Sequence, residues 1–140
     1  MTIDSAHIHG LIETFLARDD PSIEWAKPAV MKHGFFPLYV GWIATLGLRP
    51  DGRFVHWRHE DGIDAVTPCD TPFLQRLALA YSARQNPELA ALIPPPPPEA
   101  IPCAHCGGDG RLDGAVSHMI CLCGGVGWRI PGEDLGEPTG

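Results

Sequence analysis

Residues 39 to 58 read Tyr39-Val-Gly-Trp-Ile-Ala-Thr-Leu-Gly-Leu48, then Arg49-Pro50-Asp51-Gly52, then Arg53-Phe-Val-His-Trp-Arg58. The first and last segments are rich in β-branched and aromatic residues, which favour strands. The segment between them has a proline where a turn needs a fixed φ and a glycine where it needs a positive φ. The sequence therefore predicts a β-hairpin over residues 39–58.

The predicted sheet continues beyond this hairpin. A third short strand, Ala65-Val66-Thr67, is expected after the polar loop from His59 to Asp64. Strands that follow one another through short connections pair as an antiparallel meander.

A first helix is predicted over residues 5 to 18, ahead of the sheet. Its apolar residues recur at i, i+3, i+4, i+7 and i+8, which is the pattern of one buried stripe. Asp4 or Ser5 is expected to cap its N-terminus.

A second, short helix is predicted to begin at Asp20-Pro21, where an acid can cap the helix and a proline suits the first turn. Pro28 is expected to limit this helix, and Trp25 is expected to point inward. Residues 28 to 38 then form an irregular link to the sheet.

Two further helices are predicted after the sheet, starting at Thr71-Pro72 and at Asn86-Pro87. The buried face of the first consists of Phe73, Leu74, Leu77, Ala78 and Tyr81. Helices before and after a meander indicate an α+β fold, in which a small antiparallel β-meander packs with helices.

Five consecutive prolines, Pro94 to Pro98, predict a stiff, extended spacer. The predicted organisation is therefore an α+β core over residues 1–93 and a polyproline linker over residues 94–102. A zinc-binding hairpin follows over residues 103–130, and a mobile tail over residues 131–140.

Four of the five cysteines lie close together near the C-terminus, in Cys103-Ala-His-Cys106-Gly-Gly-Asp-Gly and Cys121-Leu-Cys123-Gly-Gly-Val-Gly-Trp128. Zn²⁺ in structural sites takes four tetrahedral ligands, commonly all thiolates. We therefore expect one structural Zn²⁺ per chain. Its predicted ligands are Cys103, Cys106, Cys121 and Cys123.

A hairpin turn explains how these cysteines would meet. Asp113-Gly114 is a two-residue turn signal. It would pair Leu112 with Ala115, so paired positions sum to 227 and Cys106 lies opposite Cys121. His118 is the alternative ligand, because it stands three residues before Cys121.

The segment from Cys103 to Gly110 resembles the Cys-x-x-Cys-x-Gly-x-Gly repeat of DnaJ-type chaperones. The second half matches from Cys123 to Gly127, but Ile120 stands where the first cysteine of that repeat would be. The chain also has no His-Pro-Asp tripeptide of a J-domain. The resemblance implies a zinc hairpin and not a co-chaperone.

A second resemblance covers Pro37 to Leu79, which is similar to the second half of a SUKH-superfamily domain. The similar pieces are Pro37-Leu-Tyr, Leu46-Gly-Leu-Arg-Pro-Asp51-Gly52, Val55-His-Trp57-Arg-His59-Glu60 and Thr71-Pro-Phe73-Leu74-Gln-Arg-Leu77. Residues 1 to 36 have no clear counterpart in that family. The resemblance implies a non-enzymatic binding domain, often one that neutralises a bacterial toxin by covering its active surface.

Composition narrows the kinds of partner. The formal net charge is −7, and basic residues are not clustered, which disfavours nucleic acid. An acidic chain suits a basic protein target. No signal peptide and no apolar run of membrane-spanning length are visible, so the expected compartment is the cytoplasm. Cys69 stands apart from the other cysteines and is expected to be an inert, half-buried residue.

These features favour a non-enzymatic zinc-binding protein that acts as a protein–protein interaction module. Trp128 is expected to cap the zinc site or to dock the hairpin on the core, with recognition of a partner as its alternative role.

A zinc-dependent enzyme is the alternative function. It would need an open coordination position or His118 as a ligand, with Asp109 or Asp113 as the base. The polar group His56, His59, Glu60 and Asp61 is expected to be a solvated loop. Nucleic-acid binding through the hairpin ranks third, because Arg111 and Arg129 are its only basic residues.

Overall fold

A computed structural model describes residues 4–41, 43–102 and 126–132. The chain divides between Asp70 and Thr71 into two compact units, and each is described by itself below. No helix within the described ranges is both long enough and apolar enough to cross a membrane.

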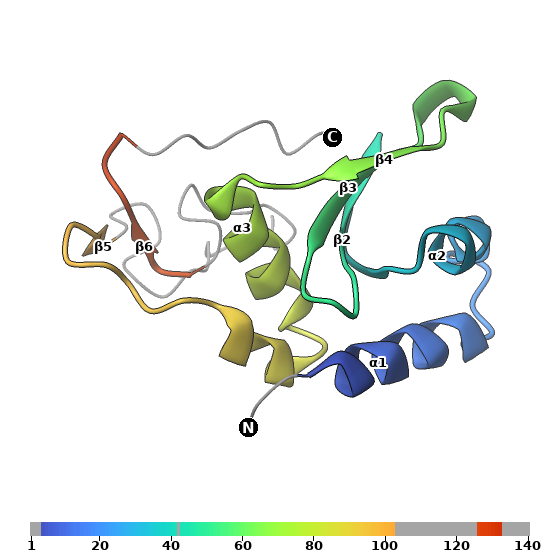
Figure 1. Cartoon of the computed structure of the whole chain (residues 1–140), viewed down its shortest axis with the longest axis horizontal. Coiled ribbons are helices and arrows are strands. Elements are labelled where there is room, and N and C mark those ends of the chain that lie inside the picture. The colour runs from blue at the N-terminus through green and yellow to red at the C-terminus, as the bar shows by residue number, and fades with distance from the viewer. Residues whose placement is uncertain (1–3, 42, 103–125, 133–140) are drawn as a thin grey trace, which may run out of the picture. The chain divides into compact units, whose positions relative to one another are not determined.

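The first unit contains a four-stranded antiparallel sheet with strands in chain order (Figure 1). The strands are β1 (Phe36–Val40), β2 (Ala44–Leu48), β3 (Phe54–Arg58) and β4 (Ala65–Pro68). The prediction of an α+β fold with an antiparallel meander is confirmed, and so is the strand expected at residues 65–67.

The predicted strand over residues 39–48 is wrong in one respect, because it is two strands. β1 begins earlier, at Phe36, and ends at Val40. The Gly41 N–H then donates to the Ala44 carbonyl oxygen at 2.8 Å, and the chain reverses into β2. The run is apolar on both sides of Gly41, so its hydropathy carries no sign of the reversal.

The turn between β2 and β3 is as predicted. Gly52 has φ +89° and donates its N–H to the Arg49 carbonyl oxygen at 2.9 Å. The Asp51 carboxylate accepts the Arg53 N–H at 2.9 Å. A side chain at residue 52 would be strained at this φ, which is why the turn needs glycine.

The first helix, α1 (Ser5–Ala17), is confirmed. The Asp4 carboxylate accepts the His7 N–H at 2.9 Å, so Asp4 is the cap. α1 packs on β1, and the Phe15 and Phe36 rings meet edge to face with centroids 6.5 Å apart.

The predicted second helix is wrong in its place. Residues 21–26 form turns, and the helix α2 is Lys27–His33, within the stretch expected to be an irregular link. Pro28 lies in the first turn of α2. Backbone N–H groups in that turn have no partner within the helix, so proline, which lacks an N–H, costs no hydrogen bond there. Gly34, with φ +67°, ends the helix. Pro28 therefore starts a helix here and does not limit one.

The core of the first unit lies around β2, whose five residues are all buried. A Cβ atom at Gly47 would come within 2.4 Å of the Phe35 ring, so only glycine lets that fully buried ring lie against the strand. Thr45 is 1% exposed, and its Oγ1 lies 3.1 Å from Nε2 of His59.

The described part of the second unit contains α3 (Pro72–Ser82), the 3₁₀ helix η2 (Pro87–Leu92), and the short strands β5 (Ile101–Pro102) and β6 (Trp128–Arg129). α3 packs on η2. Both helices begin where they are predicted to begin. Thr71 and Asn86 occupy the cap positions, but their side chains make no capping hydrogen bond.

Candidate functional site

The two ends of the cysteine-containing segment lie side by side. β5 and β6 are antiparallel, with Ile101 opposite Arg129 and Pro102 opposite Trp128. Cys103 follows Pro102 directly in the chain. The backbone pairing therefore places Pro102 and Trp128, which flank residues 103–127, opposite each other.

The register of this pairing differs from the predicted one. A two-residue turn at Asp113-Gly114 makes paired positions sum to 227, whereas Ile101 with Arg129 sums to 230. A continuous ladder in the predicted register would pair Ile101 with residue 126, so the observed pairing is offset from it by three positions. The turn itself and the pairing of Leu112 with Ala115 lie outside the described residues.

Trp128 connects this base to α3. The guanidinium carbon of Arg76 lies 4.7 Å from the centroid of a Trp128 ring, and Arg76 is only 4% exposed. A guanidinium over an indole face is an attractive cation–π contact, and it is stronger when water is excluded. The contact agrees with the docking role expected for Trp128.

The predicted ligands Cys103, Cys106, Cys121 and Cys123, and the alternative ligand His118, all lie outside the described residues. Within the ranges that the structure describes, no three histidine, cysteine or acidic side chains are grouped so that they could hold a metal ion. The zinc site therefore stays a prediction. Cys69, expected to be half-buried, is buried at 5% exposure.

A second candidate site is an aromatic cluster in the first unit, made of Trp25, Trp57 and His59. Trp25 stacks on Trp57 with centroids 5.7 Å apart and planes at 21°. The His59 ring lies 4.9 Å from Trp25 and 4.5 Å from Trp57. Burial lowers the pKa of His59 below its usual 6.5, so this ring is neutral at neutral pH.

Trp25 does not point inward as predicted. Its side chain is 49% exposed, although one face of its ring is covered by Trp57. Its Nε1–H donates to the Ser22 carbonyl oxygen at 2.9 Å, which fixes the orientation of the ring. The result is an exposed indole that is held in place before any partner arrives.

Asp64 stands beside this cluster and joins α2 to β3. Its Oδ1 accepts the Nε1–H of Trp57 at 2.8 Å and lies 2.9 Å from His33 Nε2, while its Oδ2 pairs with Lys32 Nζ at 2.9 Å. The hydrogen bonds from Lys32 and then from His33 lower the pKa of this carboxyl to about 2. The charged carboxylate is therefore part of the folded structure at any pH above that value.

The polar group His56, His59, Glu60 and Asp61 is not one cluster. Residues alternate sides along β3, so His56 faces away from Trp57, whereas His59 contacts it. Glu60 pairs with Arg58. Asp61 lies in the turn with φ +49°.

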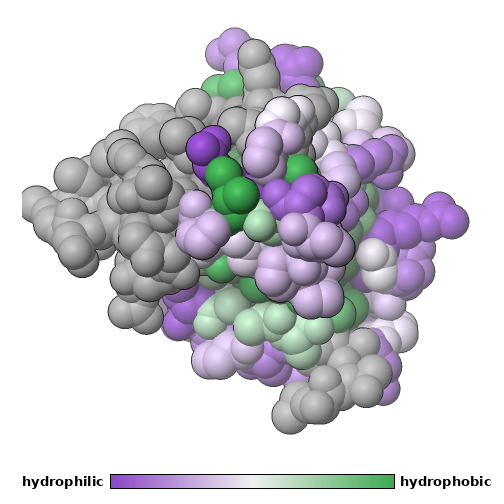
Figure 2. All heavy atoms as spheres, turned by 90° about the vertical axis from the view of Figure 1, so that its left-hand side faces the viewer, coloured by the Kyte–Doolittle hydropathy of each residue, from purple (hydrophilic) through white to green (hydrophobic). Residues whose placement is uncertain are grey.

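Five large apolar side chains are exposed among the described residues. They are Met31, Trp25, Val40, Ile63 and Ile101, which come from separate segments. On the face shown in Figure 2, green hydrophobic side chains lie among purple hydrophilic ones. Trp25 is distinguished among these five by its stacking on another aromatic side chain, Trp57.

Sequence reasoning missed the roles of Asp64 and His33. Their contact joins positions 31 residues apart, and no local pattern marks such a pair. The one available signal is chemical: a tryptophan that packs in a core needs an acceptor for its N–H, and a nearby acid can supply it.

Comparisons with protein-family models, with curated proteins and with solved structures found no match to this chain. Both resemblances drawn from its motifs therefore rest on the quoted residues alone.

Proposed function

We propose that this chain is a non-enzymatic binding protein whose C-terminal segment holds one structural Zn²⁺ through Cys103, Cys106, Cys121 and Cys123. The observation that carries the proposal is the pairing of β5 with β6, which brings the ends of the cysteine segment together. A short two-stranded ribbon is only marginally stable in water, and a metal that closes it supplies the missing free energy.

Four thiolates favour a structural zinc over a catalytic one. A catalytic zinc keeps a position for water and usually combines cysteine with histidine or an acid. The contact between Trp128 and Arg76 attaches β6 to α3. Such an attachment is what we expect of a segment that is held by a structural metal.

The binding role rests on the aromatic cluster. Tryptophan is enriched among the residues that contribute most to protein–protein affinity, especially where its orientation is fixed beforehand. Trp25 is a tryptophan of this kind, because its stacking on Trp57 and its hydrogen bond to Ser22 fix the orientation of its ring. The net charge of −7 suits a basic partner.

The segments that resemble the SUKH superfamily support a toxin-neutralising role, which is also a role in binding a protein partner. In chain order they fall on β1, on β2 and its turn, on β3, and on α3. We propose a basic bacterial toxin as the partner and the cytoplasm as the compartment.

Metal content tests the zinc proposal. Elemental analysis of purified chain should give about one zinc per molecule. Cys106→Ser should lose it, whereas His118→Ala, the matched control, should keep it. A Cys106→Ser protein with unchanged zinc would refute the ligand set, and zinc loss in His118→Ala would favour the alternative ligand and with it the enzyme.

Partner capture tests the binding role. Wild-type chain should retain a basic protein from its host, and Trp25→Ala should retain at least about tenfold less, as for a residue central to an interface. Met31→Ala is the control, because Met31 is 67% exposed but lacks the aromatic support. Equal capture by all three proteins would exclude Trp25 from the interface.

A further inference from the structure

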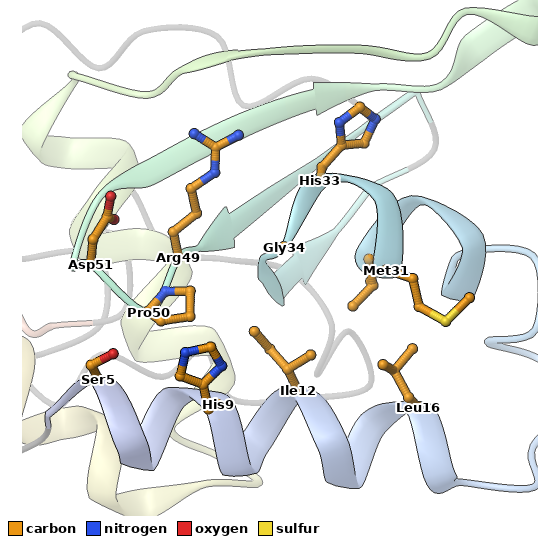
Figure 3. A pocket seen from close by; sticks show the side chains of 11 residues that line it. Ser5, His9, Ile12, Leu16, Met31, His33, Gly34, Arg49, Pro50 and Asp51 are labelled. Carbon is orange, nitrogen blue, oxygen red and sulfur yellow. The ribbon is translucent and has the colours of Figure 1, made fainter.

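A pocket in the first unit belongs to neither candidate site. It lies between α1, α2 and the turn that joins β2 to β3, and its volume is about 600 Å³ (Figure 3). Sites for small organic ligands usually measure about 300–1,000 Å³. The pocket is therefore large enough for a ligand of modest size, and all of its lining residues come from this one unit.

The lining changes character from one end to the other. Along α1, Ser5, His9, Ile12 and Leu16 follow at helical spacing, and they extend over roughly 16 Å at 1.5 Å per residue. Figure 3 shows Ser5 and His9 near Pro50 and Asp51 at one end. Ile12 and Leu16 lie with Met31 farther along α1, and the His33 side chain points away from α1 (Figure 3). The lining along α1 is therefore polar at one end and apolar at the other.

Arg49 supplies a positive charge at the edge of this pocket. In Figure 3 its side chain extends from the turn, away from α1, so that the guanidinium lies on the rim. Asp51 is nearby, but its carboxylate is engaged by the Arg53 backbone N–H and side chain.

Arg49 differs from the other basic residues of the first unit. Five of them pair with carboxylates: Arg18 with Asp20, Lys27 with Glu24, Lys32 with Asp64, Arg53 with Asp51, and Arg58 with Glu60. Within residues 4–41 and 43–70, Arg49 alone among the lysines and arginines has no such pair. Arg49 is half-buried as a residue, and a guanidinium without a carboxylate partner beside an apolar trough is complementary to an anion with an apolar tail.

We propose that this pocket binds an elongated monocarboxylate, with the carboxylate on Arg49 and the apolar tail along Ile12, Leu16 and Met31. The guanidinium fork matches the two oxygens of a carboxylate. Burial of the tail against the trough supplies the apolar part of the affinity. The site does not depend on zinc or on the aromatic cluster.

Octanoate is the probe, and the full chain is titrated with it by calorimetry and by ¹⁵N chemical-shift mapping. Saturable binding is expected, with shifts at Ile12, Leu16 and Met31. Octanol has the same tail without the charge and should bind at least about tenfold more weakly, since a hydrogen bond to a charged group is worth more than a factor of ten.

Two variants and one control variant test whether octanoate binds in this pocket. Arg49→Gln should weaken octanoate about tenfold or more, because it removes the charge from the rim. Met31→Glu should also weaken it, because it puts a negative charge beside the tail at a position exposed enough not to disturb the fold. Arg53→Gln, a neighbouring arginine that pairs with Asp51, should leave the affinity unchanged.

Equal affinity of the wild-type and Arg49→Gln proteins would overturn the proposal, as would octanol binding as tightly as octanoate. Shifts confined to residues outside the pocket would also overturn it. A peptide that saturates the same residues when octanoate does not would assign the pocket to a protein partner instead.

Discussion

The Asp64 side chain connects two elements of the first unit, α2 and β3. A single carboxylate accepts the Trp57 indole N–H and pairs with Lys32 and His33 of α2. Trp57 in turn supports Trp25. The position of the exposed indole therefore depends on a carboxylate that does not contact it.

Replacing this carboxylate should lower stability in a pH-dependent way. The pKa of Asp64 is lowered from 3.8 to about 2, so its charged form stabilises the fold fully above the unfolded value of 3.8. That contribution is lost as the pH falls from 3.8 to about 2. Asp64→Asn should therefore cost about 1 kcal/mol near neutral pH, a modest value because the side chain is 39% exposed.

Urea unfolding of both proteins between pH 2 and pH 7 measures this effect. The difference in free energy of unfolding should be constant above about pH 5 and should shrink below pH 3.8. Asp61→Asn is the control, because Asp61 is exposed and lies in the same loop. A difference that persists unchanged at pH 2 would exclude the charged carboxylate as its cause.

Single residues also limit what the sequence could predict. Gly47 is needed because Phe35 lies against it, but Phe35 stands between α2 and β1, and its contact with β2 has no local signature. The cysteine spacing is different, because the four predicted ligands lie within 21 residues and local chemistry suffices to propose them. Trp25 is predicted to point inward, but it is 49% exposed and stacks on Trp57, a residue 32 positions away that no local pattern identifies as its neighbour.

At the scale of elements, turns that rest on glycine and proline were predicted well. The turn at residues 49–52 follows from its residue types, because the φ values they allow are nearly fixed. Pro28 was ambiguous, since proline both ends one helix and starts another, and the sequence gives no sign of which. The reversal after Val40 was hidden within a continuous apolar run.

The contact between α3 and β6 gives a prediction at this scale. Trp128→Leu keeps an apolar side chain but removes the ring under Arg76, so it should lower the free energy of unfolding by about 1 kcal/mol. Urea unfolding of zinc-loaded protein measures it. Zinc content should stay the same, because Trp128 is not a ligand.

Arg129→Gln is the matched control for this contact, since Arg129 is adjacent and exposed. It should leave stability within about 0.5 kcal/mol of wild type. Equal stability of Trp128→Leu and wild type would mean that the ring contact does not hold β6 to α3.

Over the whole molecule, the sheet of the first unit has a buried central strand, whereas the described strands of the second unit are short. β2 is buried at every position. β5 and β6 contribute only two residues each. A bound ion would compensate for this difference, because metal-binding free energy becomes folding free energy when ligands are brought together only in the fold.

The ligand set decides between a closed structural ion and a catalytic one. Cobalt substituted for zinc reports its ligands directly, because thiolate ligands give intense charge-transfer absorption and tetrahedral geometry gives strong visible bands. The full chain loaded with one Co²⁺ should show four thiolates in tetrahedral geometry, unchanged in His118→Ala. A spectrum with a nitrogen ligand or a coordinated water would contradict a four-cysteine structural site.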